Sequence, residues 1–195
     1  MARTGGRIRN AEAHKAVLTA ATELLEECGY QAITIEGVAE RSGVAKSTIY
    51  RWWRSKPDLV MEAYTALVAR IVPEPDTGSL ATDLTEFAQH LHTGVRHPPR
   101  RRALRGLMAE AQLDPEFEGP FRAWAESRRQ VVLRILLRAR ERGEIRPGAD
   151  LDLAVDQIFG VFWYRLLVSH LPLDPETAAG HMDQLLHGLT APKAP

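Results

Sequence analysis

Basic side chains concentrate in one short stretch of this chain. Residues 41–56 contain five basic residues and no acidic residue, a local charge of +5, whereas the whole chain has 25 basic and 25 acidic residues. Because lysine and arginine bind phosphate oxygens, a local basic surface on a neutral protein is typical of nucleic-acid binding. The five residues are Arg41, Lys46, Arg51, Arg54 and Lys56.

Side chains that can read base edges occur in the same stretch. The sequence predicts two short helices between Thr34 and Trp53, with Thr34 as N-cap and a glycine turn at Ser42-Gly43. Two such helices form a helix-turn-helix, whose second helix enters the major groove of DNA. The exposed face of that second helix is expected to present Lys46, Ser47, Thr48, Tyr50 and Arg51.

Two flanking segments complete the predicted DNA-binding domain, residues 1–54. A first helix over about residues 11–28 presents an apolar face on which Val38, Val44 and Ile49 can pack. Residues 1–10 contain three arginines and no apolar stretch, so we predict a flexible basic arm that either enters the minor groove or remains a solvated tail. Lys56 follows the domain and lies beside a predicted helix N-terminus, which favours phosphate.

The region resembles a known family. Residues 29–59 closely resemble the signature of the TetR family of transcriptional regulators, and the central segments are TIEGVA at 34–39 and KSTIYRWW at 46–53. The resemblance covers about residues 10–65. It implies that Lys46, Ser47, Thr48 and Tyr50 face the major groove, and that Thr34, Tyr50, Trp52 and Lys56 contact phosphates.

The sequence departs from the family pattern at three positions. Trp53 stands where the family usually has phenylalanine, and we predict that it fills the core against Val17 and Leu24. Trp52 replaces a usual histidine or tyrosine, and its indole can donate only one hydrogen bond to a phosphate. Ser47 replaces a frequent glycine, which alters direct contact with bases.

Residues 55–190 are predicted to form a second, six-helix domain, so that the fold is all-α with no strand. The resemblance implies that this domain dimerises and encloses a small-molecule pocket. A helix over about residues 150–170 is apolar on nearly all sides and, with the last helix, is our candidate dimer interface. A two-fold dimer would require a near-palindromic operator. The interface candidates are Val155, Phe162, Leu166, Met182, Leu185 and Leu186.

Large apolar and aromatic side chains are the candidate pocket, because small-molecule pockets are lined mainly by such residues. Ordinary core packing is the alternative for each of them. If a ligand binds, we expect it to be largely apolar. The candidates are Phe87, Leu91, Leu104, Met108, Phe117, Phe121, Trp124, Phe159 and Trp163.

Two further clusters have less specific meanings. His90 and His92, with His97 nearby, do not predict a metal site, because positions i and i+2 of a helix point apart. A second basic cluster is either a solvated loop or a contact for an anionic ligand or the DNA backbone. It consists of Arg96, Arg100, Arg101, Arg102 and Arg105.

Other classes of protein are less consistent with the sequence. It has no nucleophile elbow, phosphate-binding glycine loop or zinc-protease motif, so we predict no enzyme activity and no cofactor. The absence of a signal peptide and of a long apolar segment, with a single cysteine, Cys28, predicts a cytoplasmic protein without a membrane partner. The predicted function is a homodimeric repressor released from its operator by a small apolar ligand; the alternative is a DNA-binding architectural or adaptor protein without an inducer.

Overall fold

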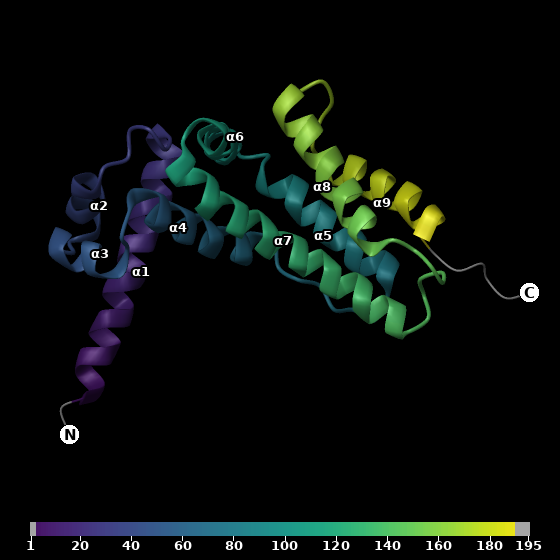
Figure 1. The fold of residues 1–195 in the computed structure, drawn as a ribbon, viewed down its shortest axis with the longest axis horizontal. Coiled ribbons are helices and arrows are strands. Elements are labelled where there is room, and N and C mark those ends of the chain that lie inside the picture. The colour runs from purple at the N-terminus through teal and green to yellow at the C-terminus, as the bar shows by residue number, and fades with distance from the viewer. Residues whose placement is uncertain (1–2, 190–195) are drawn as a thin grey trace, which may run out of the picture. The chain divides into compact units, whose positions relative to one another are not determined.

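The computed structural model describes residues 3–189, with side chains from residue 10 onward (Figure 1). This part of the chain contains nine helices and no strand, which confirms the predicted all-α fold. The helices are α1 (Arg3–Cys28), α2 (Ile35–Ser42), α3 (Lys46–Trp52), α4 (Lys56–Ile71), α5 (Leu80–Gly94), α6 (Pro98–Leu113), α7 (Pro115–Glu141), α8 (Leu151–Val168) and α9 (Pro175–Leu189).

The chain forms two compact units that are each discontinuous in sequence. The head unit contains the described residues up to Ala69 together with Arg102–Trp124, and the bundle unit contains Arg70–Arg101 together with the described residues from Ala125 onward. The boundary therefore differs from the one predicted after residue 54. The reason is aromatic packing inside the head unit, where the rings of Tyr30 and Phe117 lie 4.6 Å apart.

Helix α1 begins at Arg3, so the prediction of a flexible arm over residues 1–10 is wrong for the described residues 3–10. The prediction rested on the absence of an apolar period. Extending an existing helix requires no new nucleation, so a polar segment can continue it without a buried face.

Within the head unit, α1, α2 and α3 form a small core of their own, as expected of a helix-turn-helix. Helix α2 packs against α1 and against α3. Val17, Val38 and Ile49 are fully buried, whereas Val44 is only half-buried. Gly43 has a φ of +69° at the end of α2, a conformation that glycine adopts without the strain a side chain would cause.

In the bundle unit, α9 packs along α5 and also contacts α8 (Figure 1). The core comes from the apolar faces of α5, α7, α8 and α9, with Phe87, Ile135 and Phe162 among its largest fully buried side chains. Helix α6 begins at Pro98, because proline is tolerated in the first turn of a helix.

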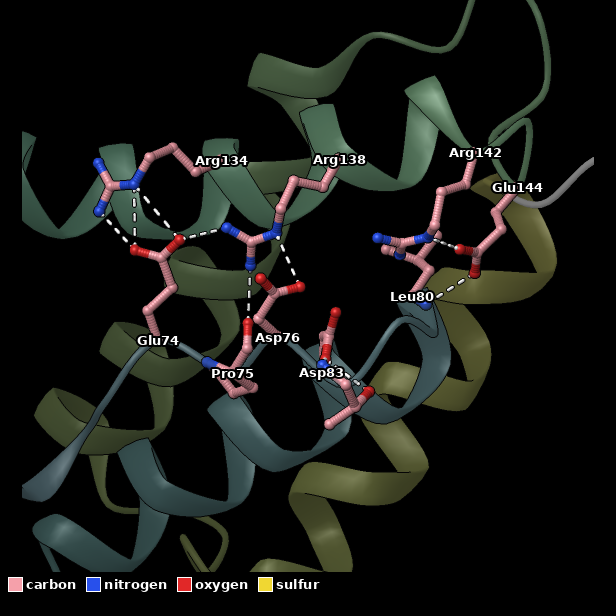
Figure 2. A network of polar contacts seen from close by, with 10 residues as sticks. Glu74, Pro75, Asp76, Leu80, Asp83, Arg134, Arg138, Arg142 and Glu144 are labelled. Carbon is pink, nitrogen blue, oxygen red and sulfur yellow. Dashed lines mark hydrogen bonds and ion pairs between the residues drawn. The ribbon is translucent and has the colours of Figure 1, made fainter.

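Arginines of α7 fix the connection between α4 and α5 (Figure 2). Glu74 accepts hydrogen bonds from Arg134 at 2.6 Å and from Arg138 at 2.5 Å, and Arg138 also donates to the carbonyl of Pro75 at 2.7 Å. Burial acts to raise the pKa of Glu74, but the two guanidinium groups outweigh it and lower the pKa. Earlier in the connection, Arg128 donates to the carbonyl of Val72 at 2.9 Å.

The start of α5 is fixed by two carboxylates. Glu144 accepts from the backbone N–H of Leu80 at 2.7 Å (Figure 2). The fully buried Asp83 accepts from both the backbone N–H and the hydroxyl of Thr77, each at 2.7 Å. These contacts satisfy backbone N–H groups that would otherwise lack a partner near a helix start.

Candidate nucleic-acid interface

Helix α3 exposes the face that the sequence predicted. Lys46, Ser47, Tyr50 and Arg51 are exposed, and Tyr50 retains 55% of its accessible surface. Lys46 and Tyr50, Ser47 and Tyr50, and Ser47 and Arg51 are three or four residues apart, so these side chains share one side of the helix. Ile49 is fully buried on the opposite side, and the remaining candidate, Thr48, is half-buried. The structure thus brings the predicted base-reading side chains together on one exposed face.

Acidic residues outside the basic stretch pair with part of its charge. Lys46 Nζ lies 2.9 Å from Glu36 Oε1 in α2, and Arg41 Nη1 lies 2.6 Å from Glu27 Oε1 in α1. The hydrogen bond to Glu36 raises the pKa of Lys46 and lowers that of Glu36. Counting charge along residues 41–56 could not reveal these partners, because both acids precede the stretch.

Thr34 has the predicted role as N-cap of α2. Its hydroxyl oxygen accepts from the backbone N–H of Gly37 at 3.0 Å, and the residue is exposed. A hydroxyl that accepts in this way still has its own proton to donate. Gly37 suits this cap, because a Cβ there would lie 3.3 Å from the Thr34 oxygen.

Lys56 holds an internal contact that the sequence did not predict. Its Nζ donates to the carbonyl of Tyr30 at 3.2 Å and lies 4.1 Å from the centroid of the Tyr30 ring. Burial, helped by the charges of Asp114, Glu110 and Glu116, raises the pKa of Tyr30 to about 12. Tyr30 therefore remains neutral at physiological pH, and Lys56 interacts with it as a cation over an aromatic face.

A four-residue contact, formed by His14, Trp52, Trp53 and Glu62, fixes the end of α3. Trp53 is only 4% exposed, which confirms its predicted burial, and its indole N–H donates to Glu62 Oε2 at 2.7 Å. His14 Nε2 lies 3.3 Å from Glu62 Oε1, and the His14 ring centroid lies 4.7 Å from Trp53 and 5.3 Å from Trp52. Glu62 is in α4 and His14 in α1, and sequence reasoning had assigned neither a role.

The nine pocket candidates separate into two groups, one in each unit. In the head unit, Leu104, Phe117, Phe121 and Trp124 are buried and Met108 is half-buried. The rings of Phe121 and Trp124 lie 5.3 Å apart, and that of Trp124 lies 5.4 Å from Tyr64.

The second group belongs to the bundle unit. Phe87 is fully buried, whereas Leu91, Phe159 and Trp163 are half-buried. The rings of Phe87 and Phe159 lie 6.1 Å apart, edge to face.

Most residues of the predicted dimer interface are buried within the protomer, and one of them, Leu185, also lines a groove formed by α8 and α9. Five of the six are no more than 9% exposed, and only Leu186 is half-buried. The apolar character of α8 on nearly all sides was correctly recognised, but it did not indicate which side faces the chain's own core. The five buried residues are Val155, Phe162, Leu166, Met182 and Leu185.

A different side of α8 is exposed. Leu153, Tyr164 and Val168 retain 53%, 59% and 55% of their accessible surface. Between them, Gly160 and Val161 line a shallow groove with His181 and Gln184 of α9. An apolar helix face of this kind is unusual on a protomer that functions alone.

Comparisons with known proteins agree with this architecture. The family model for the C-terminal domain of tetracycline-repressor-like proteins matches residues 74–185, and that for bacterial regulatory proteins of the tetR family matches residues 17–63. An uncharacterised HTH-type transcriptional regulator of Bacillus subtilis, YdeS, is 34% identical over 84% of this chain and 83% of its own length.

Solved structures show the same fold. The TetR family transcription regulator SCO0332 superposes with a TM-score of 0.80 at 36% identity, over 93% of this chain and all of its own. A protein of Saccharomonospora viridis solved in complex with choline has a TM-score of 0.62 at 19% identity, over 93% of this chain and all of its own.

The family explains the surface of α3 and also bears on the class of activity. Its members are transcriptional regulators, a class without enzymatic activity, in agreement with the prediction that the chain is not an enzyme. Within the described part of the chain, no helix combines the length and apolar character needed to cross a membrane. The chain belongs to the TetR family of DNA-binding transcriptional regulators.

Proposed function

We propose that this regulator is a repressor that binds a palindromic operator as a homodimer and leaves it when a small, largely apolar ligand binds. The exposed face of α3, with Tyr50 at its centre, is the observation that carries the proposal. A large, half-exposed aromatic side chain among basic and hydroxyl groups is suited to a groove of DNA and is uncommon on an inert surface.

The proposed contacts divide between bases and phosphates. Lys46, Ser47, Thr48 and Tyr50 read base edges, and the phosphate contacts come from Thr34, Tyr50, Arg51, Trp52 and Lys56. Glu36 competes with DNA for Lys46, because a lysine paired at 2.9 Å must exchange its carboxylate for a base or phosphate. Lys56 contacts phosphate without leaving Tyr30, because an ammonium group has three donors and one serves the carbonyl.

The proposed dimer interface is the exposed side of α8, with Leu153, Tyr164 and Val168, and the adjoining groove with α9. In a dimer with a two-fold axis at this position, the same apolar surface of each protomer would pack against that of its partner. The two α3 helices would then enter successive major grooves about 34 Å apart, which is the reason for a palindromic operator.

Ligand release requires a connection between the two units, and we assign it to α4. This helix contributes residues to both units. In the head unit it contacts Tyr30 through Lys56, Trp53 through Glu62 and Trp124 through Tyr64. A ligand that displaces α4 would therefore act on the end of α3, and DNA would weaken ligand binding by the same factor. The choline complex of the S. viridis protein, which has the same fold, supports a small-molecule ligand.

Enrichment of genomic DNA fragments by the purified protein tests the DNA-binding part. We expect a palindromic site that Tyr50→Ala no longer enriches. Leu113→Ala is the matched control, because it truncates another large side chain that is 79% exposed but lies on α6. If the wild type enriches no site, or if Tyr50→Ala enriches the same site, the proposed interface is wrong.

The ligand-release part is tested on the operator found in this way. Operator affinity is measured by fluorescence anisotropy with and without a panel of small apolar compounds. We expect at least one compound to weaken binding by about tenfold, a coupling of about 1.4 kcal/mol. If none changes operator affinity while the operator itself is bound, the adaptor interpretation replaces the repressor proposal.

A further inference from the structure

A small cleft in the bundle unit is lined by residues that DNA binding and the proposed dimer do not use. Its volume is about 240 Å³. The lining comes from the first turn of α6, the end of α8 and the connection to α9. The polar lining residues are Arg101, Arg165, Ser169 and His170, and the apolar ones are Leu166 and residues 171–173.

Neither arginine of the cleft is paired with a carboxylate among the described residues. Arg101 Nε donates to the carbonyl of Val95 at 3.1 Å, and Arg165 Nη1 donates to that of Pro172 at 3.3 Å. Several other arginines of this unit do have acidic partners, such as Glu74 for Arg138. A neutral carbonyl orients a guanidinium group but does not neutralise it, so two positive charges remain at one concave site.

Two histidines of the same unit are affected by the charge of Arg165, and as neutral rings they add no positive charge of their own. Burial is the main reason why the pKa values of His92 and His181 are lowered, and the charge of Arg165 lowers both further. The side chain of Asp174, an acid of the same unit, accepts from the backbone N–H of Thr177 at 2.8 Å and forms no ion pair with Arg101 or Arg165. The positive charge at the cleft is therefore available to an anion from solution.

Ser169, on the wall of the cleft, has an unusual backbone. Its φ of +58° makes it the one non-glycine residue with positive φ in the described part of the chain. Glycine is the usual residue at a left-handed helix end. Serine at this position instead adds a residue with a hydroxyl group to the lining that it shares with Arg101 and Arg165, and strained backbone of this kind is commonly found at binding sites.

We propose that this cleft binds a small organic carboxylate with an apolar body. The guanidinium groups of Arg101 and Arg165 hold the carboxylate, since planar guanidinium matches carboxylate geometry. The apolar body lies against Leu166 and residues 171–173, which make up half of the lining. An inorganic anion would leave that apolar surface unused. The site stands independently of the proposed repressor function, because ligand binding is measured without DNA.

Isothermal titration of the full-length protein with benzoate and with cyclohexanecarboxylate tests the proposal. Benzamide, which has the same ring and no charge, and inorganic phosphate, which has charge and no apolar body, are titrated at equal ionic strength. We expect saturable 1:1 binding of at least one carboxylate, with benzamide and phosphate weaker by about tenfold or more. Absence of saturable binding by both carboxylates, or equal affinity for phosphate, would overturn the proposal.

Substitutions then locate the site. Arg165→Gln and Arg101→Gln should each weaken carboxylate binding by about tenfold. Arg122→Gln is the matched control, because Arg122 pairs with Glu118 on α7 and does not line the cleft. Circular dichroism verifies that each variant is folded. Ser169→Gly removes the hydroxyl and also relieves the backbone strain at this position. We expect this variant to bind the carboxylate about threefold more weakly without loss of Tm. Unchanged affinity in folded Arg165→Gln and Arg101→Gln proteins would place any binding elsewhere.

Discussion

The hydrogen bond between Trp53 and Glu62 allows a sharp test of how α4 fixes the end of α3. Trp53 is 4% exposed, so removing Glu62 would leave a buried indole N–H without its acceptor. An orphaned buried donor costs about 1–3 kcal/mol. Because the Glu62 side chain is itself 47% exposed, water can replace it in part and the lower half of that range applies. We therefore expect Glu62→Ala to destabilise the protein by about 1–2 kcal/mol.

The same substitution should cost almost nothing in a Trp53→Phe background, which carries the residue usual in the family. Phenylalanine has no N–H to leave unsatisfied, and alanine is favourable inside a helix. Urea unfolding of the wild type, both single variants and the double variant gives a coupling free energy, expected to be about 1 kcal/mol or more. Glu40→Ala is the control for loss of an exposed glutamate on a neighbouring helix.

Operator affinity measured on the same four proteins shows whether the bond also positions α3. Loss of the bond should weaken DNA binding when Trp53 is present more than it does in the Trp53→Phe background. Equal costs of Glu62→Ala in the two backgrounds, in stability and in affinity alike, would show that the hydrogen bond contributes nothing and would refute the reasoning.

Three other predictions follow from contacts described above. Glu36→Gln should raise operator affinity at low salt by freeing Lys46, as seen by anisotropy, and unchanged affinity would mean that Lys46 does not reach the DNA. Phe117→Ala should lower the free energy of unfolding by about 3–5 kcal/mol, because the ring is fully buried against Tyr30; a cost below about 1 kcal/mol in urea unfolding would contradict that packing. Burial lowers the pKa of His92 in the folded protein, so that as the pH falls His92 becomes protonated in the unfolded chain before it does in the folded one. The free energy of unfolding should therefore decline as the pH falls below about 6.5. His92→Asn should flatten this decline in Tm measured against pH, and an unchanged slope would assign it to other groups.

Local features of the head unit could be predicted from the sequence. Thr34 as N-cap, Gly43 at the turn and the burial of Ile49 depend on residues within a few positions of one another, and the pattern contains that information. The burial of Trp53 could be predicted from the family resemblance, because the residue stands where the family usually has phenylalanine.

Contacts between distant segments could not be predicted. The pairing of Lys46 with Glu36 and that of Lys56 with Tyr30 depend on where separate helices come together, which no periodicity encodes. The side of α8 that faces the protomer's own core could not be predicted for the same reason. Phe162 and Tyr164 are both large aromatic residues of α8, and only tertiary packing decides that the first is core and the second is surface.

The discontinuous make-up of the head unit has a consequence for engineering. Regulators are often recombined by exchanging a DNA-reading part for that of a relative, and residue 54 would be an obvious place to join two genes. In this protein such a junction would separate Tyr30 from Phe117, whose rings pack 4.6 Å apart. A transplant that keeps its own aromatic core must carry residues 102–124 along with residues 1–69, as two grafts made at once.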